Sequence, residues 1–284
     1  MALVLPVTLF ALMFALGLGL SASELALVRH RPFLVLRALL GTCLLVPLLA
    51  LVLLKLPLAA GLSPPAGYAI ALMAICPSAP LTLRKAHLAR GKRELAASLQ
   101  VAAALLAVVT VPLLAWLFSS VFSVERWAIT PGAVFLQVVT AQLLPLASGI
   151  GLRLWKPAWA QRWDDRFDRL ADGLVLLLTV VLLVATLPGV VSFFSRDGLA
   201  LGLMAIMALG SLAIGYLLAG HDPIARTTAP LVTSMRNPGL ALVFASSHGA
   251  QLKELKVAIL AYVLITGVLS LPFVGWRQRQ GPGA

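Results

Sequence analysis

The sequence carries little charge for its length. Only 11% of its 284 residues are Asp, Glu, Lys or Arg, whereas 61% are hydrophobic. These few polar residues are not enough to cover a soluble globule of this size, and long apolar runs follow one another along the chain. The composition excludes a soluble protein and predicts an all-α polytopic membrane protein whose main partner is the lipid bilayer.

Acidic residues are scarcest, and the apolar runs have none in their interiors. The ten carboxylates fall in loops or at the ends of these runs: Glu24, Glu94, Glu125, Asp164, Asp165, Asp168, Asp172, Asp197, Asp222 and Glu254. Their absence from the interiors removes the usual ligand of a coupling cation and the usual proton carrier of a pump. It also removes the acid or base that an intramembrane enzyme would need, so we expect no catalysis.

Cysteine and histidine are too few and too dispersed for a metal or redox site. Cys43 and Cys76 both lie in apolar segments and form neither a CxxC motif nor a disulfide framework. The four histidines lie near the ends of apolar runs, without the spacing of a zinc site. We therefore expect no cofactor and no resident metal.

Nine apolar runs are long enough to cross a bilayer about 30 Å thick at about 1.5 Å per residue. They cover residues 3–22, 33–57, 67–87, 94–119, 131–154, 171–194, 199–219, 226–247 and 256–276. No basic residue precedes the first run, so we read it as a retained helix rather than a signal peptide.

Lys and Arg concentrate in alternate loops and the C-terminus. This predicts an N-terminus outside and a C-terminus in the cytoplasm, in the inner membrane of a bacterium. The loop cations also account for the net charge of +12 without a nucleic-acid partner.

Prolines interrupt two of these runs. Pro77 and Pro80 fall in the third run, and Pro230 and Pro238 fall in the eighth. Because proline has no amide N–H, each would free the carbonyl four residues before it in a helix. The freed carbonyls would be those of Met73, Cys76, Arg226 and Ser234. Such backbone must face a cavity or packed protein, so we expect two discontinuous helices that cross near the membrane midplane.

The order of the runs predicts an inverted repeat. Runs one to four fall into register with runs six to nine at an offset of five, which reverses their orientation. Residues 1–119 then form a first repeat of four helices, and residues 131–276 a second repeat of five. Between them, residues 155–172 carry aromatic side chains at i, i+4 spacing among charges. We expect this segment to lie along the cytoplasmic interface as a hinge or anchor.

Arg236 is the exception to the neutral run interiors. A cation near the middle of a span costs about 2.5–3.5 kcal/mol on insertion scales, so it needs a partner or a wet cavity. Two roles remain open. The guanidinium either caps carbonyls freed by the prolines, or it meets an anionic substrate or replaces a bound cation. Arg84 and Lys85 are assigned to the start of a basic loop.

Polar residues beside the two breaks form the candidate substrate site. They are Ser78, Thr82, Thr233, Ser234, Arg236 and Asn237, with Gln100 and Thr42 on the flanking runs. Paired, proline-interrupted segments in the two halves of a membrane chain favour a secondary transporter with its site at the crossing. The cargo expected from this set is a small organic anion or an amphipathic acid.

The motifs along the chain resemble the bile acid:sodium symporter superfamily. The resemblance rests on Gly17-Leu18-Gly19-Leu20, Arg31-Pro32, a Cys-Pro break followed by His87-Leu88-Ala89-Arg90-Gly91, and the second break from Arg226-Thr227 to Met235-x-Asn237-x-Gly239-Leu240. It implies two discontinuous helices that cross, and a panel domain that rocks against a core domain to carry organic anions. The core would comprise residues 33–119 and 199–276, and the panel residues 3–22 and 131–194.

The sequence departs from this family where the family binds sodium. The resemblance implies Glu at Val232 and Gln at Arg236, and only Asn237 keeps the pattern. In the first break a hydroxyl survives but the expected amide is lost, and Ala96 occupies a further ligand position. We therefore expect a degenerate sodium site and transport without sodium. A passive gated pore and a transport-dead, receptor-like protein remain as alternatives.

Overall fold

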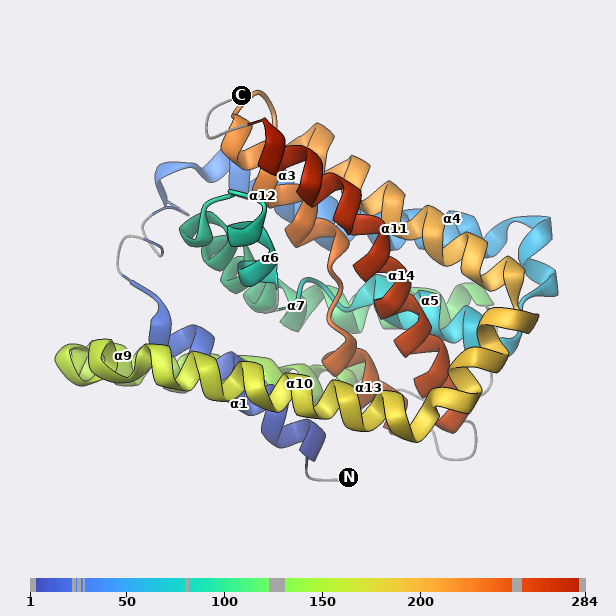
Figure 1. Ribbon diagram of the computed structural model, residues 1–284, viewed down its shortest axis with the longest axis horizontal. Coiled ribbons are helices and arrows are strands. Elements are labelled where there is room, and N and C mark those ends of the chain that lie inside the picture. Colours follow the sequence, from blue (N-terminus) through green and yellow to red (C-terminus); the bar gives the residue numbers. More distant parts are fainter. Residues whose placement is uncertain are drawn as a thin grey trace.

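The computed structural model describes residues 4–21, 24, 27, 29–79, 82–122, 131–246 and 252–280, and every regular element in these ranges is a helix (Figure 1). Six helical segments are long and apolar enough to cross a membrane: Pro32–Lys55, Arg93–Phe122, Pro131–Trp155, Pro157–Arg196, Gly198–Leu218 and Lys253–Arg279. The α1 helix (Val4–Gly19) and the α5 helix (Pro64–Ile75) are apolar but shorter. These helices confirm the all-α polytopic membrane protein, whereas the count of nine spans stays a prediction.

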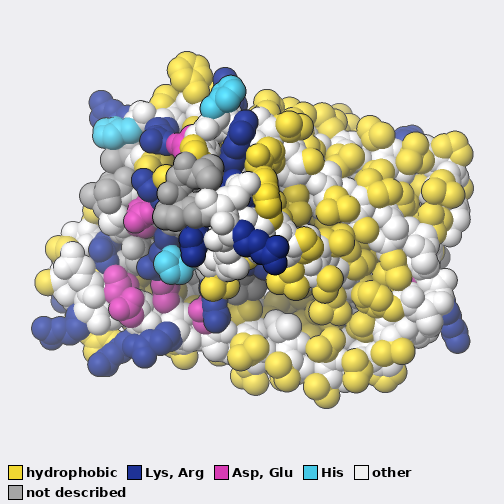
Figure 2. Space-filling model, turned by 45° about the horizontal axis from the view of Figure 1, so that its top comes forward, with side chains coloured by type: hydrophobic (Ala, Val, Ile, Leu, Met, Phe, Trp, Pro, Cys, Tyr) yellow, Lys and Arg dark blue, Asp and Glu magenta, His cyan; other side chains and the backbone are white. Residues whose placement is uncertain are grey.

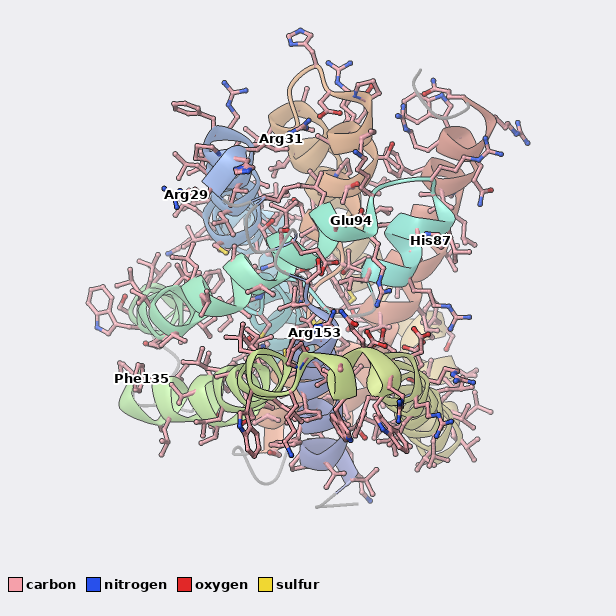
Figure 3. The ribbon with its side chains drawn as sticks, turned by 90° about the vertical axis from the view of Figure 1, so that its left-hand side faces the viewer. Arg29, Arg31, His87, Glu94, Phe135 and Arg153 are labelled. Carbon is pink, nitrogen blue, oxygen red and sulfur yellow. The ribbon has the colours of Figure 1, made fainter. Side chains whose placement is uncertain are left out.

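Charged side chains gather at one end of the molecule, and hydrophobic side chains cover most of the rest of the face seen in Figure 2. Arg29, Arg31, His87, Glu94 and Arg153 belong to three separate stretches of the chain, yet all lie at this end (Figure 3). A charged end beside a broad apolar surface is the pattern of a protein immersed in lipid.

A π-helical segment joins α3 (Pro32–Leu40) to α4 (Val46–Lys55). This segment, η1 (Gly41–Leu45), ends where the Val46 N–H donates to the carbonyl of Gly41, five residues earlier. In that register the next carbonyl, that of Thr42, faces the nitrogen of Pro47, which has no hydrogen. The Thr42 carbonyl therefore has no partner within its own helix. A second π segment, η3 (Val139–Leu143), joins α8 (Pro131–Val138) to α9 (Leu144–Trp155) and likewise precedes a proline, Pro145.

The aromatic segment of residues 155–172 is mostly the beginning of one long helix. The α10 helix runs without interruption from Pro157 to Arg196 and continues through Pro188; no proline separates its charged first turns from the apolar turns that follow. The rings of Trp159 and Trp163 stack with their centroids 6.0 Å apart. The expected hinge or anchor is thus continuous with the expected sixth span.

Glycines allow α1 to pack closely on α9. A Cβ atom at Gly17 would lie 2.3 Å from the carbonyl oxygen of Leu146, and one at Gly149 would lie 2.3 Å from that of Phe14. Both distances are too short for any side chain, so the backbones touch through these two positions. Together with α10, these helices lie side by side along the lower edge of Figure 1.

Most of the other helices lie above α1, α9 and α10 in Figure 1, while α13 (Pro238–Ser246) reaches down to them and contacts α1. They include α7 (Arg93–Phe122), α11 (Gly198–Leu218), α14 (Leu252–Arg279) and two interrupted pairs, α5 with α6 (Thr82–Leu88) and α12 (Pro223–Ser234) with α13. Asp222 caps α12, since its carboxylate accepts from the N–H groups of Ile224 and Ala225 and also pairs with Arg31. Burial raises the pKa of Asp222, but these donors outweigh burial and hold the pKa below its ordinary value.

Candidate functional site at the crossing of two interrupted helices

The two interrupted helices meet through their backbones. The first helix ends at Ile75 and resumes at Thr82, and the second ends at Ser234 and resumes at Pro238. Between these ends the Ala79 N–H donates to the carbonyl of Met235 at 3.0 Å, and the Asn237 N–H donates to that of Cys76 at 3.2 Å. The expectation that the breaks approach each other is therefore confirmed. Each break meets the backbone groups of the other.

The prolines differ in how they act. Pro77 lies within the first break and Pro238 opens α13, but Pro230 lies inside α12. The prediction of a break at Pro230 is corrected, because the helix continues past this residue and the interruption lies at residues 235–237. Pro80 lies outside the described residues.

Arg236 donates only to backbone carbonyls. Its Nε donates to Met73 at 2.9 Å, one terminal nitrogen donates to Thr42 at 2.8 Å and Thr233 at 3.4 Å, and the other donates to Ala74. The side chain is 3% exposed and makes no ion pair among the described residues. The arrangement matches the capping role considered for Arg236 and resembles a cation coordinated by carbonyl oxygens.

Each of these carbonyls lacks its ordinary helical partner. Pro77 removes the donor for Met73, and Pro47 removes the donor for Thr42 in the π register. Ala74 belongs to the last turn of α5, and the N–H that Thr233 would use belongs to Asn237, which donates to Cys76 instead. One guanidinium therefore satisfies carbonyls from three separate segments, which explains why a cation is stable here.

The hydroxyl and amide residues fall into two groups around the breaks. The hydroxyls of Thr42 and Thr233 hydrogen bond to each other at 3.0 Å, beside Arg236. The Ser78 hydroxyl donates to Gln100 Oε1 at 2.5 Å, and Gln100 Nε2 donates to the Ser78 carbonyl at 2.9 Å. Gln100 and Thr42 thus lie beside the breaks, as the repeat scheme predicts.

The remaining candidates serve the ends of helices. The Thr82 hydroxyl donates to the carbonyl of Ala79 at 2.5 Å, and that of Ser234 donates to Leu231 at 3.4 Å. Asn237 Oδ1 accepts from the Leu240 N–H at 3.1 Å and so caps α13, while its Nδ2 has no hydrogen-bond partner among the described residues. All eight candidates are at most 3% exposed, so the site is closed in this structure.

Two positions where the family resemblance implies sodium ligands have no polar side chain. Val232 is buried in α12 and Ala96 is buried in α7, and neither side chain offers a ligand atom. The carbonyls of Met73, Thr42 and Ala74, which could coordinate a cation, accept from Arg236 instead. A second positive charge among them would be repelled by the guanidinium.

Two buried polar residues, Tyr262 and Gln142, were not among the candidate site residues predicted from the sequence. Tyr262 on α14 is fully buried. Gln142 in η3 is buried, and its Nε2 has no hydrogen-bond partner among the described residues. A buried polar side chain on a largely apolar helix was the available signal.

Two comparisons with known proteins bear on this site. The model of the sodium bile acid symporter family matches residues 6–196. A protein of Bacillus subtilis (strain 168), described as the uncharacterized sodium-dependent transporter YocS, is 26% identical over 259 residues. That match covers 87% of this chain and 75% of the relative.

Proposed function

Because the chain belongs to the sodium bile acid symporter family, and is a membrane transporter rather than an enzyme, we propose that it carries a small organic anion or an amphipathic acid by alternating access. The observation that carries this proposal is the reciprocal hydrogen bonding of Ala79 with Met235 and of Asn237 with Cys76. Crossing, interrupted helices concentrate polar backbone in the middle of a membrane protein, where secondary transporters bind their cargo.

The proposed architecture has nine spans in an inverted repeat, with a panel of residues 3–22 and 131–194 and a core of residues 33–119 and 199–276. The close packing of α1 on α9 and α10 supports the panel, and the contacts of α12 with α6, α7 and α11 support the core. The clustering of cations at one end supports a cytoplasmic assignment for that end, with the N-terminus outside.

Transport in this proposal does not need sodium, because Arg236 is a tethered cation in the place of a mobile one. Its contacts with the carbonyls of Met73, Thr42 and Ala74 support this role over direct pairing with the substrate. The expected Glu is Val232, so the negative charge that would hold sodium is missing at the same site. Both changes make the protein more positive at this site, which disfavours binding of a mobile cation.

In this proposal the cargo carboxylate accepts a hydrogen bond from Asn237 Nδ2, which has no other partner among the described residues. Leu9 of α1 lies against Gly239, with a Cβ built there 2.3 Å from Leu9 Cδ2 and 3.4 Å from Asn237 Oδ1. Asn237 is therefore close to the seam between the proposed panel and core. The positive charge of Arg236, the neighbouring residue, attracts the carboxylate without touching it. This attraction is strong in a site of low dielectric constant and favours anions.

Counterflow in proteoliposomes tests this function. Thermal-shift screening of organic anions selects a candidate, and labelled candidate is then exchanged against unlabelled candidate in sodium and in choline buffer. Equal exchange in both buffers supports a sodium-independent carrier. Strong stimulation by sodium refutes the tethered cation, saturable binding without exchange identifies a receptor-like protein, and flux that does not saturate identifies a pore.

A pair of substitutions tests the tethered cation directly. Val232→Glu combined with Arg236→Gln restores the residue types that the family resemblance implies. We expect sodium chloride, relative to potassium chloride, to stabilise this double variant against heat and to leave the unmodified protein unchanged. Val232→Glu alone is the matched control, because Arg236 still donates to the carbonyls of Met73, Thr42 and Ala74 and would repel a second cation there.

A further inference from the structure

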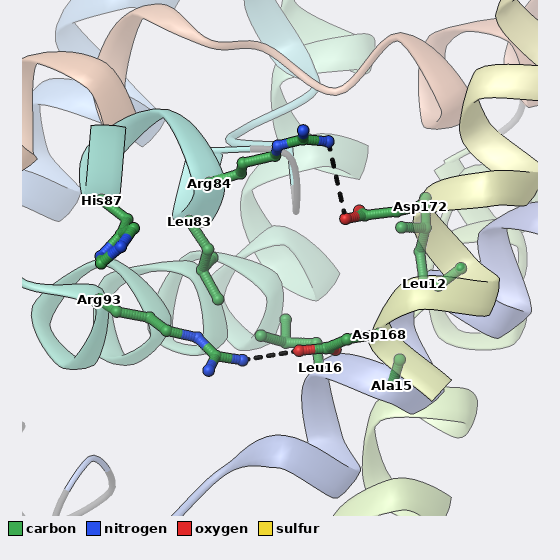
Figure 4. A pocket seen from close by; sticks show the side chains of 10 residues that line it. Leu12, Ala15, Leu16, Leu83, Arg84, His87, Arg93, Asp168 and Asp172 are labelled. Atoms are coloured by element: carbon green, nitrogen blue, oxygen red, sulfur yellow. Dashed lines mark hydrogen bonds and ion pairs between the residues drawn. The ribbon is translucent and has the colours of Figure 1, made fainter. Parts of the chain in front are cut away.

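A cavity of about 300 Å³ separates two groups of helices at the charged end of the molecule (Figure 4). Leu12 and Leu16 of α1 and Ala171 of α10 line one side, and Leu83 and His87 of α6 line the other. In backbone packing α6 contacts α7, α12 and α14, whereas α1 contacts mainly α9 and α10 and, to a smaller extent, α13. The cavity therefore lies on the seam between these two groups.

Two ion pairs bridge this cavity. Arg93 at the start of α7 reaches Asp168 of α10 at 2.6 Å, and Arg84 of α6 reaches Asp172 of α10 at 3.9 Å. Asp168 and Asp172 are one helical turn apart, so both acids face the same side of α10. A third pair, Arg153 with Asp164 at 3.2 Å, joins α9 to α10 and does not cross the cavity.

The two bridging pairs differ in strength. The side chains of Arg93 and Asp168 are 49% and 36% exposed and are in direct contact. Those of Arg84 and Asp172 are 72% and 44% exposed and are farther apart. The Arg84 guanidinium is thus well solvated and held loosely, which leaves it available to another carboxylate.

We propose that these two ion pairs form a latch between the two groups of helices, and that a carboxylate ligand entering the cavity opens the latch by displacing Asp172 from Arg84. This inference rests on the proposed rocking of one group against the other. The apolar wall from Leu12, Leu16 and Leu83 suits the hydrocarbon part of an amphipathic acid, and Arg84 suits its head group. The Arg93 pair, with the apolar contacts between α1 and α7, holds the groups together until the weaker pair has been exchanged.

Thiol labelling of detergent-solubilised protein tests the latch. The Leu12→Cys variant places a thiol on the cavity wall, and the native Cys43 and Cys76 are 4% and 0% exposed, so they contribute little background. Asp168→Asn and Asp172→Asn, added separately, should each raise the rate of labelling by a water-soluble maleimide about two- to fivefold, the range expected for an exposed ion pair.

Two matched variants separate the latch from a general loss of structure. Asp164→Asn removes the pair that lies within one group and should leave the labelling rate unchanged. The charge exchange of Arg93→Asp with Asp168→Arg should return the rate to that of the parent. Unchanged labelling in Asp168→Asn and Asp172→Asn, or an equal increase in Asp164→Asn, would overturn the latch.

Potassium benzoate tests the ligand step. It should raise the labelling rate of the parent protein about two- to fivefold over equimolar potassium chloride, whereas neutral benzyl alcohol should not. Arg84→Gln should raise the basal rate and remove the benzoate response. A response that persists in Arg84→Gln, or no response in the parent, would overturn the exchange. Labelling does not depend on transport, so a failure of counterflow refutes the proposed function without deciding this result.

Discussion

Replacing Arg236 with Gln removes the group on which the crossing depends. Gln has the amide that the family resemblance implies at this position, but it has two N–H donors in place of five. At most two of the carbonyls of Met73, Ala74, Thr42 and Thr233 then keep a partner. We expect Arg236→Gln to fold less stably and to lose anion binding.

The magnitude follows from the contacts of the guanidinium. Each buried carbonyl left without a donor costs about 1–3 kcal/mol, and two or more are left in the variant. The variant no longer buries the guanidinium charge, and the desolvation cost that this avoids offsets part of the loss. A net loss of about 3–5 kcal/mol in the free energy of unfolding lowers the melting temperature by roughly 6–20 °C.

Thermal unfolding in detergent, in potassium chloride and without ligand, measures this loss. Arg236→Lys is the informative comparison, because an ammonium keeps the charge but cannot span all the carbonyls that the planar guanidinium reaches. We expect it to fall between the parent and Arg236→Gln. A melting temperature of Arg236→Gln within 2 °C or so of the parent would refute the capping argument, since it would mean that these carbonyls need no fixed donor.

Three further predictions concern the surroundings of the site. Gly149→Ala should lower the melting temperature by several degrees because its Cβ meets the backbone of α1, whereas Gly151→Ala, with open space around it, should not. Gln100→Leu should cost about 1–3 kcal/mol and slow exchange, because the Ser78 carbonyl loses its donor. The pKa of Asp222 is lower in the folded protein than its value of about 3.9 in the unfolded chain, so the ionised carboxylate stabilises the fold at neutral pH, and this stabilisation is lost as acid protonates it. Thermal unfolding measured from pH 6 to pH 3 should therefore show a smaller fall in melting temperature for Asp222→Asn than for the parent.

The presence of a break in each of the two runs could be predicted because proline acts locally. The residues alone indicate that Pro77 frees the carbonyl of Met73, and the structure shows that carbonyl accepting from Arg236. The carbonyl of Cys76 was also expected to need a donor, and it accepts from Asn237. Polar backbone in an apolar span must find a partner, so its place in the sequence already marks the place where segments meet.

The identity of the partners could not be predicted, because it depends on packing. Pro230 has the same local chemistry as Pro77, yet α12 continues through it while Gly215 of α11 packs against its backbone. The contact between Arg236 and Thr42 depends on the π register that precedes Pro47, which no periodicity in the sequence reveals. The count of charged residues in the loops places Arg93 and Asp168 on the same side of the membrane, but it does not predict that they form an ion pair.

The contacts of Arg236 also limit which parts of the protein can move. The guanidinium joins α5, η1 and the end of α12, and separating any one of them would leave a buried carbonyl unpaired. These segments therefore move together. At the charged end, by contrast, solvated ion pairs across a cavity join the two groups of helices, beside the apolar cluster that Leu16 and Val101 belong to. In the proposed rocking, a change between two states that keeps the crossing intact would take place along that seam, where α1, α6, α7 and α10 meet.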